Sequence, residues 1–302
     1  MRTRIQRSAL PFVIGCGLAF HPLSIARADS LRKLTNIENA YPFPTADGRH
    51  IVFQSNRTGN WEIYAMNLQG GSVLPLTSHA AADVTPAVSP DGTRILFATD
   101  RDGNEEVYVM NRDGSSPRNL SRSKGSDSHP SWSPDGRRIV FCSTRDDGEN
   151  DEIYVMNADG TESKRLTANG LVWDTFPSFS PDGSRILFRR ALRARGPEGT
   201  TFNSEIFLMN ADGTAPANIS RDGAFDGWPA WSPDGKTIVF SSNRSDVYQI
   251  YAMSPDGSNV RRLVESAYTD VRPRFLPDGR NVIFNREREG TREIYLLRRA
   301  PE

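Results

Sequence analysis

One short pattern, a run of small and apolar residues followed by an Asp-Gly turn and a second apolar run, occurs six times in this chain. The turn aspartates are Asp47, Asp91, Asp135, Asp182, Asp234 and Asp278, so successive repeats are spaced by 44, 44, 47, 52 and 44 residues. A second shared segment follows each turn, as in EIYVMN at 152–157. Self-similarity at a nearly fixed period of this length indicates an array of equivalent supersecondary units.

Each repeat reads as four short strands. In the third repeat these are HPSWS (129–133), RIVFCS (138–143), EIYVMN (152–157) and KRLT (164–167). Glycine in the connecting turns supplies the positive φ that tight hairpins require. No helical periodicity competes with this pattern. Four-stranded units with this period predict an all-β fold, a six-bladed β-propeller.

The two ends of the repeat array complement each other. The sixth repeat stops at EIYLLRRAPE (293–302) without a fourth strand, whereas LRKLT (31–35) is a fourth strand with no partners before it. An open sheet edge invites unwanted pairing with other chains. We therefore expect the N-terminal strand to complete the last blade and close the ring.

The first 28 residues differ from the rest of the chain. Three arginines (Arg2, Arg4 and Arg7) precede the apolar stretch 8–20, and ARA at 26–28 offers small residues at a cleavage site. This pattern predicts a signal peptide at 1–28, cleaved after Ala28, and a propeller at 29–302 that is periplasmic or secreted. VIGC at 13–16 leaves a second reading open, a lipid anchor on Cys16. No stretch reaches the roughly 20 apolar residues of a membrane-spanning helix.

Charge and cysteine content bear on nucleic-acid binding and on disulfide bonds. The chain has 37 basic and 37 acidic residues, and the leader carries four arginines and no acid, which leaves 33 against 37, a net of −4. No basic surface for nucleic acid is expected from this balance. Cys142 is the only cysteine outside the leader, so no internal disulfide is expected.

The composite repeat carries a family likeness. SWSPDGRRIVF (131–141) followed by EIYVMNADGT (152–161) and RLT (165–167) resembles the propeller repeat of the TolB family, periplasmic proteins of the Tol–Pal envelope system. The likeness covers residues 31–298, without the α/β domain that precedes the propeller in TolB. It implies a six-bladed propeller that docks an envelope protein, such as a peptidoglycan-associated lipoprotein. Similar repeats occur in propellers of serine peptidases and oligosaccharide lyases, so function has to be argued from a site.

One face of the expected propeller carries the length variation. Second-to-third and fourth-to-first strand connections lie on the same face, and they include the longest insertion, 189–204, with its four arginines. Functional loops of repeat folds cluster on one side. This face is the candidate binding face.

An acidic or amide residue stands three positions before the proline of each first strand. These residues are Asn39, Asp83, Asp127, Asp174, Asp226 and Asp270. Each carboxylate could fix its loop by accepting backbone N–H groups. Alternatively, the six could form a ring of negative potential at the channel mouth that attracts a cation or a basic segment. If the ring attracts a cation, a Ca²⁺ site among Asp174, Asp226 and Asp270 is a further, weaker hypothesis.

The residue just before each of these prolines varies strongly. The set is Tyr41, Thr85, His129, Phe176, Trp228 and Arg272, and Trp173 stands beside Asp174. Aromatic and arginine side chains gathered around one mouth are typical of protein-binding hot spots. Packing between blades is the alternative reading. With the acidic set, these residues make up the predicted partner-binding face.

Arginine recurs four residues after the second-strand phenylalanine. The arginines are Arg57, Arg101, Arg145, Arg244 and Arg288, and the expected cross-strand partners are Glu62, Glu106, Glu152, Gln249 and Glu293. Such pairs stabilise antiparallel hairpins, so we expect a structural role.

Catalytic signatures are sparse. Outside the leader, the histidines His50, His79 and His129 belong to different blades and lack metal-ligand spacing, and no G-x-S-x-G motif occurs. We therefore expect a monomeric, non-catalytic propeller that binds an envelope protein and needs no cofactor. Two alternatives stay open: a metal-dependent carbohydrate-active enzyme at the channel mouth, and a sensor that binds a small ligand in the channel.

Overall fold

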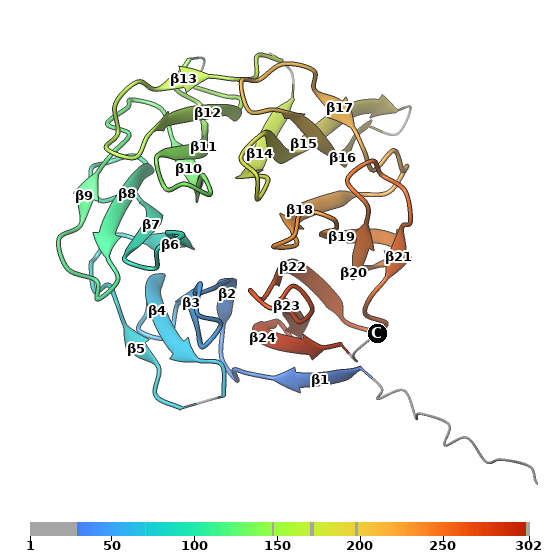
Figure 1. The fold of residues 1–302 in the computed structure, drawn as a ribbon, viewed down its shortest axis with the longest axis horizontal. Coiled ribbons are helices and arrows are strands. Elements are labelled where there is room, and N and C mark those ends of the chain that lie inside the picture. The colour runs from blue at the N-terminus through green and yellow to red at the C-terminus, as the bar shows by residue number, and fades with distance from the viewer. Residues whose placement is uncertain (1–28, 70, 147, 170–171, 197–198, 300–302) are drawn as a thin grey trace, which may run out of the picture.

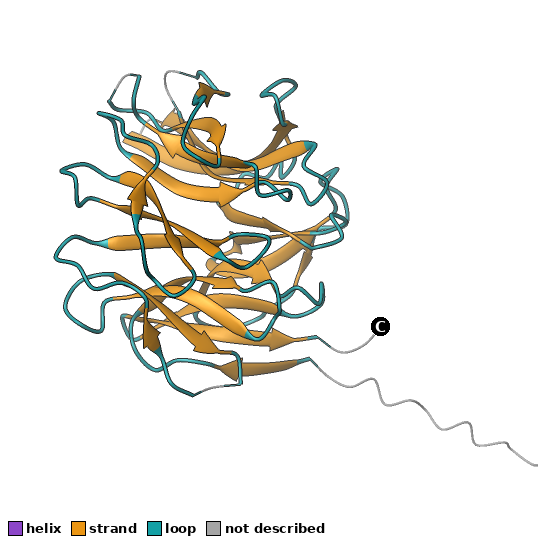
Figure 2. Cartoon of the chain, turned by 60° about the vertical axis from the view of Figure 1, so that its left-hand side comes forward, coloured by secondary structure: helices purple, strands orange, loops and turns teal. Residues whose placement is uncertain are grey.

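The computed structural model describes residues 29–69, 71–146, 148–169, 172–196 and 199–299. These residues form six four-stranded antiparallel sheets arranged in a ring around a central channel (Figure 1). The described chain consists only of strands and their connecting loops (Figure 2), and none of it forms a helix long and apolar enough to cross a membrane. The predicted signal peptide and Cys16 lie outside the described residues.

In blades 1 to 5 the strands run outward from the channel in sequence order. Blade 1 consists of β2 (Asn39–Pro44), β3 (His50–Ser55), β4 (Glu62–Asn67) and β5 (Leu74–Pro75). Blade 2 consists of β6 (Asp83–Val88), β7 (Arg94–Thr99), β8 (Glu106–Asn111) and β9 (Arg118–Asn119). Blade 3 consists of β10 (Asp127–Trp132), β11 (Arg138–Ser143), β12 (Glu152–Asn157) and β13 (Lys164–Arg165).

The second half of the ring repeats this order. Blade 4 consists of β14 (Trp173–Phe179), β15 (Arg185–Gly196), β16 (Gly199–Asn210) and β17 (Ala217–Asn218). Blade 5 consists of β18 (Asp226–Trp231), β19 (Ile238–Ser245), β20 (Val247–Met253) and β21 (Arg261–Arg262). Blade 6 consists of β22 (Thr269–Phe275), β23 (Val282–Arg288), β24 (Thr291–Arg298) and β1 (Ser30–Lys33).

The last blade is shared between the two ends of the chain, as expected. β1 pairs antiparallel with β24, in a register that sets Ser30 opposite Arg298 and Lys33 opposite Tyr295 (Figure 1). The predictions of an all-β, six-bladed propeller and of its closure by the N-terminal strand are confirmed.

The core lies between neighbouring blades. The second-strand phenylalanine of every repeat is fully buried; these residues are Phe53, Phe97, Phe141, Phe188, Phe240 and Phe284. Burying a phenylalanine side chain stabilises a fold by about 2–3 kcal/mol. The repeat therefore places one large apolar side chain at the same depth of each blade.

The Asp-Gly hairpins that define the repeat serve the fold. Asp135 Oδ1 accepts hydrogen bonds from the Ser133 hydroxyl and the Arg137 amide, and Gly136 adopts a φ of 68°. A Cβ on Gly136 would lie 4.0 Å from Pro90 of the preceding blade's turn. The turns of adjacent blades thus pack against each other on one face of the ring.

The blade 4 insertion forms regular structure. β15 and β16 pair continuously from Arg185 opposite Asn210 to Gly196 opposite Gly199. Residues 189–204 therefore extend the hairpin as a two-stranded ribbon.

Candidate functional site at the channel mouth

Every first strand contains a β-bulge at its X-Pro dipeptide. The pairing register shifts there in all six blades, as between Ser128 and Ser131 in β10. The residue before the proline has a φ of 50–56° in each case: Tyr41, Thr85, His129, Phe176, Trp228 and Arg272. A left-handed backbone costs a residue other than glycine roughly 1–2 kcal/mol. Bulges re-aim side chains, and here all six turn into the lining of one cavity in the channel.

Side chains of neighbouring blades accept hydrogen bonds from three of these bulges. The Thr85 amide donates to Gln54 Oε1 at 2.8 Å, and the Arg272 amide donates to Ser241 Oγ at 3.1 Å. Across the closing blade, the Tyr41 amide donates to Asn285 Oδ1 at 3.2 Å. Each acceptor residue directly follows the second-strand phenylalanine of its blade. A polar residue at that place in an otherwise apolar strand could have indicated this contact from the sequence.

Prolines, polar residues and a cluster of aromatic rings line the cavity. It encloses about 570 Å³ between its lining atoms, part of it open to solvent. The rings of His129 and Phe176 lie 4.1 Å apart between centroids. Phe176 also packs against Tyr41 at 6.4 Å and Trp228 at 6.1 Å. Side chains from four blades therefore form one continuous cluster in the channel.

Arginine side chains stack on aromatic rings in the channel. The Arg272 guanidinium lies 4.4 Å from the centre of the Tyr41 ring and 5.3 Å from that of Trp228. Arg274, two residues on, lies 4.6 Å from the centre of the Phe43 ring. Burial lowers the pKa of Arg274 to about 10, so its side chain keeps its charge at neutral pH. The channel thus carries cations on aromatic faces.

His129 is neutral in this environment. Burial lowers its pKa to about 3, and the charges of Arg189, Arg272 and Arg274 act in the same direction. Its Nδ1 lies 2.9 Å from the Ser128 hydroxyl. Burial is the main cause of the depressed pKa, and the three arginine charges lower it further.

The aspartates of the predicted acidic ring are fully buried and paired with arginines. The pairs are Asp83–Arg101 at 2.8 Å, Asp127–Arg145 at 2.9 Å, Asp174–Arg190 at 2.7 Å, Asp226–Arg244 at 2.9 Å and Asp270–Arg286 at 2.7 Å. Asn39 accepts from Arg57 at 3.0 Å in the same way. The negative charge of the ring is therefore neutralised within the blades.

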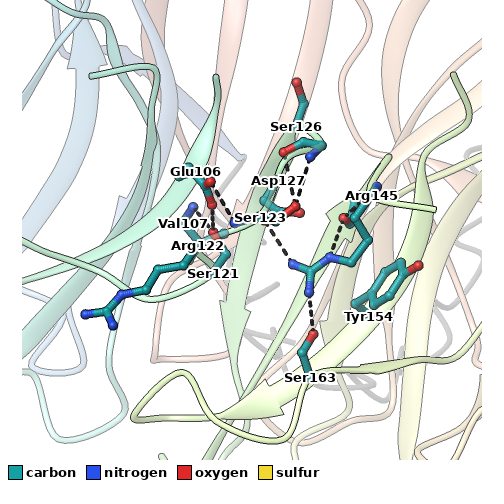
Figure 3. A network of polar contacts seen from close by, with 12 residues as sticks. Glu106, Val107, Ser121, Arg122, Ser123, Ser126, Asp127, Arg145, Tyr154 and Ser163 are labelled. Atoms are coloured by element: carbon teal, nitrogen blue, oxygen red, sulfur yellow. Dashed lines mark hydrogen bonds and ion pairs between the residues drawn. The ribbon is translucent and has the colours of Figure 1, made fainter. Parts of the chain in front are cut away.

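Blade 3 shows the full arrangement (Figure 3). Arg145 donates to Asp127 Oδ2 at 2.9 Å, to the Ser143 hydroxyl at 2.9 Å and to the Ser163 hydroxyl at 2.8 Å. Its guanidinium also stacks over Tyr154 at 4.9 Å. The arginine ties its first strand to the third, which is a structural role.

The expected arginine–glutamate pairs across the second and third strands are wrong in their partners. The arginines form ion pairs with the first-strand aspartates instead. In blades 4 and 6 the ion pair is made by Arg190 and Arg286, which stand two residues after the phenylalanine rather than four. In those blades the arginine lies directly opposite the aspartate, because Asp174 pairs with Arg190 and Asp270 with Arg286 in the strand register. Arg288 pairs with Glu289 at 3.3 Å.

The third-strand glutamates bind the fourth strand and the loop after it. Glu106 accepts from the Ser121 hydroxyl and, at 2.8 Å, from the Ser123 amide (Figure 3). Glu152 likewise accepts from the Thr167 hydroxyl at 2.5 Å and the Asn169 amide at 2.6 Å. These carboxylates fix the loops that lead into the next blade.

The part of the chain that the structure describes does not bring metal ligands together. The residues of the calcium alternative, Asp174, Asp226 and Asp270, lie on three blades and each faces its own arginine. Within the described ranges, no group of three or more His, Cys, Asp or Glu side chains is placed to hold a metal ion. Trp173 is half-buried, and its indole N–H donates to the Glu149 carbonyl at 3.1 Å.

Comparisons with solved structures show the same fold. A protein described as TolB from Agrobacterium tumefaciens matches with a TM-score of 0.68 and 22% identity, over 91% of this chain and 98% of that chain. TolB from Acinetobacter baumannii matches with a TM-score of 0.67 and 24% identity, over 80% of this chain and 57% of that chain. An oligogalacturonate lyase from Vibrio parahaemolyticus matches with a TM-score of 0.57 and 15% identity, over 90% and 95%.

Sequence comparisons identify the family. A segment of 43 residues is 51% identical to a TolB homolog of Chlorobaculum tepidum. This segment makes up 14% of this chain and only 10% of that relative's length. The family model for the TolB beta propeller domain matches residues 30–144, 118–197 and 191–299, nearly all of the described propeller. The chain therefore belongs to the TolB β-propeller domain family.

Proposed function

We propose that this propeller is a non-catalytic protein-binding module of the cell envelope, exported by the leader at 1–28 and docking its partner at the channel mouth. The observation that supports this function is the ring of six pre-proline side chains. The fold holds all six in a left-handed conformation and turns them toward one cavity. A repeat needs no such variety of side chains for its own packing, and strained backbone concentrates at functional sites.

The chemistry of the ring suits a protein partner. Tyr41, Phe176 and Trp228 are half-buried, rigid and amphipathic, and Arg272 lies between two of them. Aromatic and arginine side chains dominate the binding energy of protein interfaces. The likeness to TolB makes a peptidoglycan-associated lipoprotein the first partner to test.

The test is capture by the immobilised propeller, residues 29–302, first from envelope extract and then with a purified peptidoglycan-associated lipoprotein. Trp228→Ala is expected to weaken binding at least tenfold, because truncation of a central aromatic residue costs about 2 kcal/mol or more. Leu74→Ala is the matched control, since Leu74 is 60% exposed on the outer strand β5. Equal capture by both variants would contradict the proposed face.

A further inference from the structure

Three arginines of the channel occupy positions at which no other blade has a charged residue. Arg272 takes the pre-proline position and Arg274 the position after the proline, where the other blades have Phe43, Ala87, Ser131, Ser178 and Ala230. Arg189 follows the second-strand phenylalanine, where the other blades have Gln54, Ala98, Cys142, Ser241 and Asn285. The repeat itself therefore does not require these charges, yet all three act on His129 in one channel.

These arginines differ from the structural arginines in their partners. Both kinds stack on aromatic rings, as Arg145 does on Tyr154 at 4.9 Å and Arg272 on Tyr41 at 4.4 Å. Arg145 and its four counterparts also hold a buried aspartate. Among the described residues, Arg272 and Arg274 form no ion pair, and Arg272 Nε is buried without a hydrogen-bond partner. Two half-buried guanidinium groups thus carry no counter-charge from the protein, which leaves them able to bind an anion.

Further polar atoms in the same lining are free of protein partners. Trp228 Nε1 and the hydroxyls of Thr85 and Ser178 make no hydrogen bond to described protein atoms, and all three residues line the cavity with Arg272. These N–H and O–H groups are placed to donate to a ligand that enters the cavity. N–H and O–H donors favour an acceptor, in agreement with an anion.

The shape and polarity of the cavity restrict the anion. A guanidinium group stacked by its face keeps its N–H edge free, and that planar fork matches a carboxylate. The wall beside it is aromatic, built from Tyr41, Phe176 and Trp228. His129 is neutral and adds no charge. This combination suits one carboxylate attached to an apolar group better than a highly charged, fully hydrated anion.

We propose that the channel mouth binds a small organic carboxylate, held through its carboxylate by Arg272 and Arg274 and through its apolar part by Tyr41, Phe176 and Trp228. This site does not depend on the proposed protein binding, because it needs no partner protein. The site would explain why the channel carries arginines at positions where the other repeats have uncharged residues.

N-acetylphenylalanine is the probe, and its neutral amide, N-acetylphenylalaninamide, is the matched ligand control. Titrations of residues 29–302 are followed by isothermal calorimetry and by tryptophan fluorescence, since Trp228 lines the cavity. We expect the carboxylate to bind at least tenfold more tightly than the amide. We also expect inorganic phosphate to bind more weakly than the carboxylate.

Arginine variants test the assignment. Arg272→Gln and Arg274→Gln are each expected to weaken binding of the carboxylate at least tenfold, and Arg272→Lys to weaken it less. Arg94→Gln is the control, because Arg94 stacks on Trp132 at 4.7 Å outside the cavity lining. Unchanged urea midpoints will establish that the variants fold.

The proposal is wrong if N-acetylphenylalanine does not bind at 10 mM, which corresponds to roughly 3 kcal/mol of binding free energy. It is also wrong if the acid and the amide bind equally or if phosphate binds more tightly than the acid. Wild-type affinity in both glutamine variants would likewise contradict it. Competition with a captured protein partner distinguishes the source of the carboxylate. Displacement by N-acetylphenylalanine assigns the natural carboxylate to a segment of the partner, and simultaneous binding assigns it to a free small molecule.

Discussion

At the scale of single residues, the buried arginine–aspartate pairs are the main polar determinants of each blade. Asp127 is fully buried, so its charge depends on Arg145, whose side chain is only 18% exposed. The guanidinium also stacks over Phe141 at 5.1 Å. Removal of one partner from such a pair leaves an uncompensated buried charge, which costs about 3–5 kcal/mol.

This balance predicts a graded response at Asp127. Asp127→Ala is expected to lower the free energy of unfolding by about 3 kcal/mol, and Asp127→Asn by less. Blade 1 gives the reason, because Asn39 accepts a hydrogen bond from Arg57 at 3.0 Å without a negative charge. Urea denaturation measures both. Glu265→Ala, at a side chain 79% exposed, is the control and should change stability by less than about 0.5 kcal/mol. Equal losses for Asn and Ala would contradict the prediction.

The sequence predicts the arginine–aspartate pairs and the channel-mouth residues only in part. It shows that the aspartates and arginines recur, but not that Arg145 reaches Asp127, because the two are 18 residues apart and meet only when the first and second strands pair. The identity of the channel-mouth residues follows from the alignment of the repeats. The positive φ of His129 does not, since it depends on the β-bulge that forms when the first and second strands pair.

At the scale of elements, the turn between the third and fourth strands of one blade docks on the residue that follows the fourth strand of the blade before it. Gly160 in blade 3 has a φ of 94°, and a Cβ added there would lie 2.5 Å from the Leu120 carbonyl oxygen of blade 2. Gly114, Gly213 and Gly257 make equivalent approaches. Glycine at this turn therefore serves two purposes, the left-handed backbone and the close contact between blades.

Gly160→Ala is expected to destabilise the protein more than Gly92→Ala. Both glycines have positive φ, so each alanine carries a backbone strain of about 1 kcal/mol. A Cβ on Gly92 meets nothing within 4 Å, whereas one on Gly160 has to displace backbone of the neighbouring blade. We expect a further loss of at least about 1 kcal/mol for Gly160→Ala, measured as the difference in urea unfolding free energy. Equal losses would show that the contact between blades is unimportant.

Strands were easier to predict than their connections. Apolar runs such as RIVFCS leave little choice of element, and Asp-Gly fixes the hairpins. The insertion at 189–204 has no such alternation and was expected to be a loop, yet it extends β15 and β16 as a ribbon. Backbone pairing propagates from the paired strands of blade 4 without requiring an apolar face, which a sequence pattern does not reveal.

At the scale of the whole molecule, the ring is held closed by one short strand. The Leu34 amide donates to the Ile294 carbonyl at 2.8 Å, and the Ile294 amide donates to the Thr35 hydroxyl at 2.9 Å. Leu34 also packs against the buried cluster that contains Ile294 and Leu296. Without these contacts, β24 would be an exposed edge strand, and the contact of blade 6 with blade 1 would lose part of its support.

A variant that begins at Asn36 is therefore expected to be less stable by at least about 3 kcal/mol. Partial burial of Leu34 contributes about 1 kcal/mol, and each lost hydrogen bond about 1 kcal/mol. Urea denaturation measures the loss, and sedimentation detects self-association through the freed edge. A synthetic peptide of residues 29–36 should restore the midpoint in a saturable way, whereas a peptide of the same composition in scrambled order should not. If the truncated variant unfolds at the wild-type midpoint, the closing strand does not hold the ring, and the contacts between blades alone account for its stability.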